Sequence, residues 1–179
     1  LGRRVASSGA TWPVTQGYDT AGRMTSLSTT RDGDAWDTTQ WLHDPATGVV
    51  TNKRYADDSV VAYSHDAASR PLRTTWARGA WRENAYDADG LLVATAYSDA
   101  TPTVSRTYDT FQRLAAASNA VAAYAYANSD LGVATNETAV IGMNTYEIVR
   151  EHDEFHRLSA SSLSINGANK GGIHYRYDA

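Results

Sequence analysis

The chain has 179 residues, about the length of one domain, and its 42% hydrophobic content favours an ordered chain over a disordered one. Sixteen Lys and Arg against twenty Asp and Glu give a formal net charge of −4, which disfavours a nucleic-acid partner. The absence of Cys excludes disulfides, Cys-ligated zinc and thiol catalysis. No apolar run approaches the roughly 18 residues of a membrane helix, so we predict no membrane span.

An aromatic or His residue followed by an acid recurs along the whole chain. Successive acids lie 19 to 25 residues apart if Asn128 is counted as a degenerate member, so the repeat is about 22 residues long. The pairs are Tyr18-Asp19, His43-Asp44, His65-Asp66, Tyr86-Asp87, Tyr108-Asp109, Ala127-Asn128, His152-Asp153 and Tyr177-Asp178.

Six of the eight pairs are followed by Gly, Arg or both, which gives a motif of the form YDxxGRL; the unit at Asn128 and the last pair, Tyr177-Asp178, do not show it. The matching residues are Gly22, Arg23, Gly48, Arg70, Gly90, Arg113 and Arg157. An Asp at the start of a turn accepts hydrogen bonds from backbone N–H groups one or two residues on, and Gly supplies a positive φ. Ser69, Gln112 and His156 stand at the Gly position in three units, where we expect a cost of about 1 kcal/mol each. For the Arg we predict stacking on a neighbouring Tyr and pairing with the Asp one unit along.

The segments between the turns alternate with period two. Val61, Tyr63 and His65 share one face, and the Ala-rich stretch 114–127 is interpreted as strand because Tyr124 and Tyr126 alternate. Further turn formers lie halfway between the acidic marks, so each unit holds two strands. We predict an all-β chain of stacked antiparallel β-hairpin repeats, residues 1–179 as a single array, in a curled or spiralling sheet with free edges. The start at Leu1, without Met or an apolar signal segment, suggests a fragment of a much longer chain.

With YDxxGRL kept at this period, the sequence resembles the YD-repeat or RHS-repeat family, which includes bacterial RHS shell proteins, the B and C components of Tc toxins, and teneurins. The resemblance covers essentially the whole chain. It implies a continuous β-strip that spirals into a hollow shell and in several members encloses a C-terminal toxin. The chain is therefore expected to be a structural section of such a wall, secreted or at the cell surface. Its expected partners are the rest of the parent chain or an enclosed polypeptide, and its free edges could pair with each other.

Several residue groups resemble catalytic motifs but fit the repeat better. The segment 152–156 places His152 and His156 four apart, yet Glu does not follow the first His as the zinc-protease motif HExxH requires. Asp57-Asp58, and Glu151 with Asp153, could be read as glycosidase carboxylates. We interpret Asp57-Asp58 as a turn, and Glu151 and Asp153 would share a strand face only if the strand runs through the start of the turn. The motifs GxxxxGK[ST], GxGxxG and GxSxG are absent. We predict no enzymatic activity, no metal and no cofactor.

Trp residues leave an alternative open. If Trp36, Trp41, Trp76 and Trp81 face outward on adjacent strands, they form a platform that stacks on sugar rings, as in a carbohydrate-binding surface module. If they pair across strands near the hairpin turns, they stabilise the sheet. We favour the second interpretation.

Overall fold

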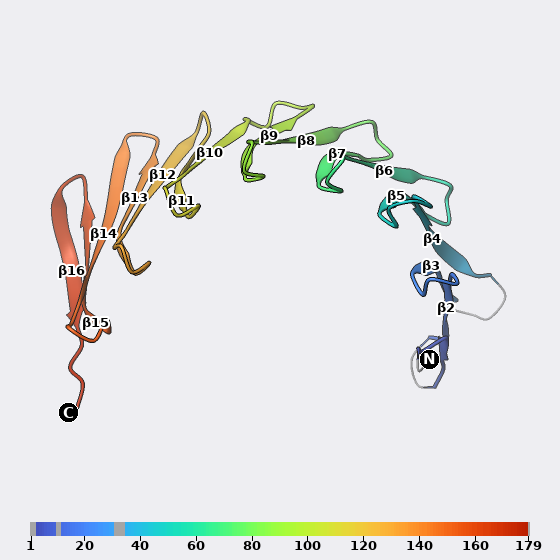
Figure 1. Cartoon of the computed structure of the whole chain (residues 1–179), viewed down its shortest axis with the longest axis horizontal. Helices are drawn as coiled ribbons and strands as arrows, with labels where there is room; N and C mark the ends of the chain where they lie inside the picture. The colour runs from blue at the N-terminus through green and yellow to red at the C-terminus, as the bar shows by residue number, and fades with distance from the viewer. Residues whose placement is uncertain (1–2, 10–11, 31–34, 179) are drawn as a thin grey trace. The chain divides into compact units, whose positions relative to one another are not determined.

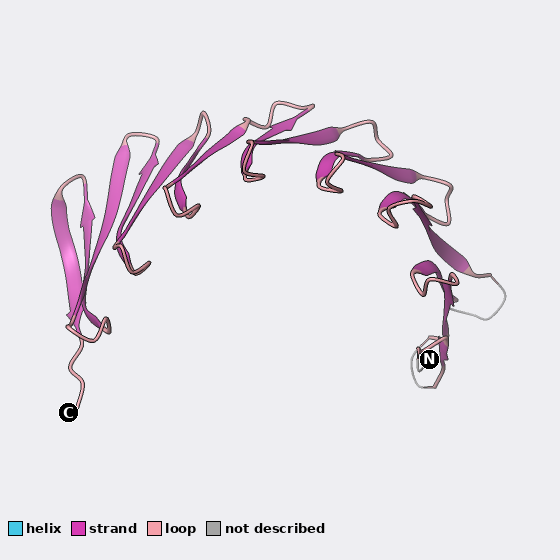
Figure 2. Ribbon diagram, viewed as in Figure 1, coloured by secondary structure: helices cyan, strands magenta, loops and turns pink. Residues whose placement is uncertain are grey.

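The computed structural model describes residues 3–9, 12–30 and 35–178. These residues form sixteen β-strands and no helix, so the all-β prediction is confirmed (Figure 2). β-Branched and aromatic residues, which pack well on a pleated surface, fill much of the strands. Within the described ranges, no helix is present that could cross a membrane.

The chain divides into two compact units, residues 1–84 with 97–99 and residues 85–96 with 100–179. The first unit holds β1 (Ala6–Ser7), β2 (Val14–Tyr18), β3 (Met24–Thr29), β4 (Asp37–His43), β5 (Val50–Arg54), β6 (Val60–His65) and β7 (Pro71–Thr75). The second unit holds β10 (Val104–Tyr108), β11 (Leu114–Ser118), β12 (Ala122–Asn128), β13 (Ala134–Ile141), β14 (Asn144–His152), β15 (Leu158–Ile165) and β16 (Ala168–His174) (Figure 1). Strands β8 (Trp81–Tyr86) and β9 (Leu92–Tyr97) contribute residues to both units.

Within each unit, every strand pairs antiparallel with the next strand of the sequence. In the first unit Trp41 of β4 lies opposite Lys53 of β5, which lies opposite Val61 of β6. In the second unit a row of directly opposed residues on adjacent strands runs from Tyr124 of β12 to Tyr146 of β14. The Ala-rich stretch forms β11 and β12, as predicted. The stacked hairpins of the sequence prediction are therefore confirmed within each unit.

Burial is shallow on these sheets. Among the described residues, the hydrophobic side chains that count as buried are Val61 and Ala160, at 6% and 8% exposure. Because so little apolar surface is enclosed, cross-strand pairs and the turns carry a large share of the stability.

The same irregularity precedes six of the turns. The strand register shifts by one residue at the position just before the turn, where an aromatic or His residue usually stands. The shifts fall at Tyr18, His43, His65, Tyr108, Asn128 and His152. A bulge of this kind bends the strand locally, just before the turn.

Candidate functional site: the acidic turns and their arginines

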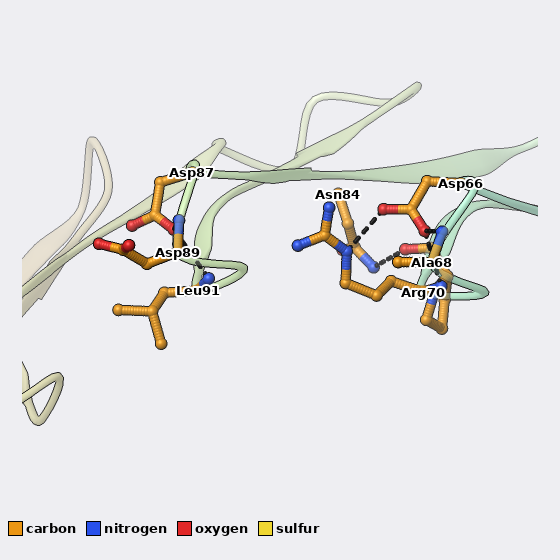
Figure 3. A network of polar contacts seen from close by, with 8 residues as sticks. Asp66, Ala68, Arg70, Asn84, Asp87, Asp89 and Leu91 are labelled. Atoms are coloured by element: carbon orange, nitrogen blue, oxygen red, sulfur yellow. Dashed lines mark hydrogen bonds and ion pairs between the residues drawn. The ribbon is translucent and has the colours of Figure 1, made fainter.

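Each acidic turn is closed by the carboxylate and backbone of its Asp. At Asp66, the N–H groups of Ala68 and Arg70 both donate to Oδ1 at 2.9 Å (Figure 3). The Asp66 N–H donates to the Arg70 carbonyl at 3.0 Å, and the Ser69 N–H donates to the Asp66 carbonyl at 2.9 Å. The predicted Asp turn is thus present, and the turns that begin at Asp19, Asp109 and Asp153 share this backbone pattern.

The arginine of each complete motif pairs with the Asp of its own turn. Nε lies 2.6 Å from the Asp Oδ2 in the pairs Arg23–Asp19, Arg70–Asp66 and Arg113–Asp109, and 2.7 Å in Arg157–Asp153. The prediction that Arg pairs with the Asp one unit along is therefore wrong. The motif places the two residues four apart across a tight turn, where the short distance favours the local partner.

These contacts keep the carboxylates ionised. The backbone N–H of Arg23, followed by its guanidinium, lowers the pKa of Asp19 below its ordinary value. The backbone N–H of Arg70 lowers the pKa of Asp66 in the same way. At Asp109 desolvation is the largest influence and raises the pKa, but the hydrogen bonds from Arg113 together outweigh it, so the pKa is still lowered.

The Gly position of the motif has a left-handed backbone whether or not Gly occupies it. Ser69, Gln112 and His156 each have φ of 62°, close to Gly22 at 78°. These three residues therefore take the positive φ of the Gly position, and the expected cost of about 1 kcal/mol at each stays a prediction. A positive φ alone therefore does not explain why Gly stands at the other turns.

Three observations show that arginine side chains of one turn lie against the next turn. Arg113 Nη1 donates to the Ser129 carbonyl of the following turn at 3.0 Å. The Arg157 guanidinium lies 4.3 Å from the centroid of the Tyr177 ring, so the predicted stacking of Arg on a neighbouring Tyr is confirmed there. A Cβ atom built on Gly48 would lie 2.8 Å from Arg23 Nη1. The arginine thus reaches forward to the next turn, and Gly leaves it room.

Whether Gly or another residue stands at the Gly position depends on which residue stands at the Arg position of the preceding turn. Gly stands where the turn before carries Arg, in the sequence pairs Arg3 with Gly22, Arg23 with Gly48, Arg70 with Gly90, and Arg113 with Gly132. Another residue stands where the turn before carries an aliphatic residue, in the pairs Val49 with Ser69, Leu91 with Gln112, and Val133 with His156. A Cβ at Gly22 would overlap the Arg3 guanidinium, which agrees with this alternation. Sequence reasoning missed the rule because it compared positions within a unit and not between successive units.

The tyrosine of the motif also links successive turns. Tyr108 Oη donates to the Leu92 carbonyl at 2.9 Å, and Tyr177 Oη donates to the Leu158 carbonyl at 2.8 Å. Both acceptors directly follow the Arg position of the preceding turn, as does the Arg4 carbonyl that accepts from Tyr18 at 3.3 Å. His has no hydroxyl group, so units with His at this position lack the hydrogen bond from the Tyr hydroxyl to the backbone carbonyl of the preceding turn.

Asn128 is not the acidic mark of its unit. Ser129 begins the turn: its N–H donates to the Val133 carbonyl at 2.8 Å, and its Oγ accepts from the Val133 N–H at 3.2 Å. Asn128 instead stands at the bulge where other units have Tyr or His. Matching Asn to Asp by side-chain type moved the predicted register by one residue. The unit also keeps its Gly, because Gly132 has φ of 81°.

Asp87 and Gly90, two further predicted motif residues, lie in their expected turn. Asp87 Oδ1 accepts from the N–H groups of Asp89 at 3.1 Å and Leu91 at 2.8 Å (Figure 3). Gly90 completes that turn with φ of 85°, and Tyr86 ends β8 just before it. Asp178 follows β16 at the end of the described residues.

Of the groups that resembled catalytic motifs, Asp57, Asp58, Asp153 and His156 lie in turns, whereas Glu151 and His152 lie at the end of β14, where Glu151 is opposite Ala160. Asp153 closes its turn on Arg157, and His156 has the positive φ of the Gly position. Asp58 pairs with Arg54 at 2.7 Å, while Asp57 Oδ1 accepts from the Ser59 N–H at 3.0 Å. Across the described ranges, no three His, Asp or Glu side chains are grouped so that they could hold a metal ion.

The Trp residues are spread over the first unit, and cations lie over three of the rings. Lys53 Nζ lies 5.6 Å from the Trp41 ring centroid, and the Arg73 guanidinium lies 4.3 Å from that of Trp81. Arg78 lies 6.0 Å from the Trp76 ring centroid. Trp36 precedes β4 and is 43% exposed. Cations placed over these rings cover part of the surface that a sugar ring would need.

Solved structures with a similar fold include Tc toxin chains. The Photorhabdus luminescens Tc holotoxin pore matches with a TM-score of 0.74 and 11% identity, over 91% of this chain and 9% of that chain. Crystal structures of TcdB2-TccC3, and of TcdB2-TccC3 without its hypervariable C-terminal region, match with TM-scores of 0.58 and 0.55, each at 13% identity. They cover 90% and 97% of this chain and 12% of each of those chains. No protein-family model and no curated protein sequence matches the chain.

The likeness defines the class of fold. The chain has the all-β hairpin-repeat fold of RHS- or YD-repeat shell proteins, as its motif implied. Within that class, the structures it resembles are those of the Tc toxin TcdB2-TccC3 chains, and this chain spans about a tenth of their length.

Proposed function

We propose that this chain is a structural section of a larger β-shell that encloses another polypeptide, such as a toxin, and has no chemistry of its own. The observation that carries the proposal is the forward link between turns, in which Arg113 joins its own Asp109 to Ser129 of the next unit. Such links make each repeat depend on its neighbours, which suits a continuous wall. The whole of residues 1–179 then acts as a single curled array.

The partner in this proposal is the remainder of a parent repeat chain together with its cargo, in a secreted or cell-surface assembly. Electron cryomicroscopy of the complete gene product tests it. A closed shell with polypeptide density inside supports the proposal, and a solid or fully open repeat array contradicts it. If the chain is instead complete alone, its free edges should self-associate, and gel filtration over a range of concentrations would show this.

A second candidate is a cell-surface module that binds carbohydrate or another partner. The exposed Trp36 favours it, since an accessible indole can stack on a sugar ring. Titration of Trp fluorescence with a panel of glycans tests this candidate. A saturable shift that is lost in Trp36→Ala supports it, and an unchanged spectrum removes it.

A further inference from the structure

A polar groove of about 220 Å³ lies between two successive acidic turns of the first unit. The turn of residues 44–49 forms one side, and the turn of residues 66–70 with the end of β6 forms the other. The residues that matter here are Asp44, Thr47, Val49, Ser64, Asp66 and Ser69.

An arginine side chain fills the same position elsewhere in this chain. Arg113 lies between its own Asp109 and the next turn, where it reaches Ser129 and lies 3.5 Å from a Cβ built on Gly132. In the groove, Val49 stands at the Arg position, and valine is too short to span two turns. The groove is therefore the space that a guanidinium occupies in the sister turns.

One acceptor in the groove has no donor within the described part of the chain. Asp44 Oδ1 accepts from the N–H groups of Ala46 at 3.0 Å and Thr47 at 2.7 Å, and from Thr47 Oγ1 at 2.9 Å. In the Arg-bearing turns the second oxygen, Oδ2, receives Nε of the arginine, but no described donor reaches Asp44 Oδ2. Asp66 Oδ2 already accepts from Arg70 at 2.6 Å, so Asp44 supplies the available charge.

The Asp44 carboxylate is ionised and keeps Oδ2 open to a further donor among the described residues. The N–H of Thr47, then its hydroxyl, lowers the pKa of Asp44, so the carboxylate is ionised near neutral pH. The charge of Arg23, in the preceding turn, also lowers the pKa of Asp44, but within the described residues Arg23 makes no ion pair with Asp44, and it approaches at Gly48, outside the lining of the groove. Hydroxyl groups of Thr47, Ser64 and Ser69 add neutral acceptors within the lining.

We propose that this groove binds the guanidinium group of an arginine supplied by another molecule, with Asp44 Oδ2 as its charged acceptor. A guanidinium presents several donors in a fixed plane, so it can satisfy the carboxylate of one turn and the oxygens of the next together. A lysine ammonium is a more strongly hydrated point charge without this planar set of donors, so it binds less well. The ligand is a free arginine or an arginine carried on a polypeptide.

Titration of the full chain with N-acetylarginine amide and with the peptide Gly-Gly-Arg-Gly-Gly tests the proposal, with amide NMR shifts of Thr47 and Ser69 as the readout. We expect saturable shifts, about tenfold weaker binding for the lysine counterparts, and about tenfold weaker binding in Asp44→Asn. Binding of the peptide alone assigns the arginine to a polypeptide, and binding of both ligands shows that a free arginine suffices.

Variants that fill the groove give the decisive comparison. The double variant Val49→Arg/Ser69→Gly recreates the sister arrangement, so it should remove the shifts and raise the Tm. The matched control, Val133→Arg/His156→Gly, makes the same change in the second unit and should leave binding at Thr47 and Ser69 intact. No saturable shift in the folded chain, or a Thr47 shift that persists in Val49→Arg/Ser69→Gly, would overturn the proposal.

Discussion

Arg113 joins its turn to Ser129 of the next turn through a 3.0 Å hydrogen bond from Nη1 to the backbone carbonyl, while its Nε stays 2.6 Å from Asp109. A single side chain thus closes one turn and binds the next. In a sheet with little buried apolar surface, links of this kind add to the cohesion that strand pairing gives to successive repeats.

Replacing Arg113 by Lys should cost stability although the charge is kept. A lysine has one terminal nitrogen, so it cannot hold Asp109 and reach Ser129 with the geometry of the guanidinium. We expect the Tm to fall by about 2–4 °C. Thermal unfolding followed by circular dichroism measures this, with the exposed Arg176→Lys as the control. Equal Tm values for Arg113→Lys and the original chain would count against the link.

Removing the hydroxyl of Tyr108 should loosen the same region. The Tyr108→Phe variant keeps the ring opposite Leu114 but leaves the Leu92 carbonyl without its 2.9 Å donor. We expect a loss of about 1 kcal/mol in the free energy of unfolding, measured in urea. Tyr126→Phe is the matched control on β12, and a loss there as large as at Tyr108 would show that the hydrogen bond is not the cause.

Acid should weaken the turns. Because hydrogen bonds from Arg70 lower the pKa of Asp66 in the folded chain, the unfolded chain takes up protons more readily as the pH falls. The stability contributed by the ionised Asp66 is complete above the ordinary carboxyl pKa of about 4, and it is lost as the pH falls through the lowered value. Urea unfolding at several acidic pH values should therefore show a steeper loss for the original chain than for Asp66→Asn. The exposed Asp130→Asn should keep the steep dependence, and identical slopes in all three chains would refute this role for Asp66.

Local chemistry made much of the fold predictable from the sequence. An Asp before a Gly or another turn residue closes a turn wherever it stands, so Asp66 and Asp109 could be placed without coordinates. Alternation of Tyr124 and Tyr126 was enough to assign β12 as strand in an Ala-rich stretch.

Contacts between units were harder to predict. Side-chain type suggested Asn128 as the turn residue, but the hydrogen bonds of Ser129 decide the register, and a shift of one residue changes every assignment around it. The partner of Arg113 was misjudged because charge pairing can be local or between units, and only distance decides which.

The coupling between Arg23 and Gly48 tests the central claim most directly. Gly48→Ser places a Cβ within 2.8 Å of Arg23 Nη1, whereas Ser69 is accepted at the same turn position after Val49. In a double-mutant cycle of Gly48→Ser with Arg23→Val, we expect Gly48→Ser to cost at least about 1 kcal/mol more when Arg23 is present. If the two substitutions instead destabilise the chain additively, the arginine does not need the glycine, and the account of how successive turns fit together is wrong.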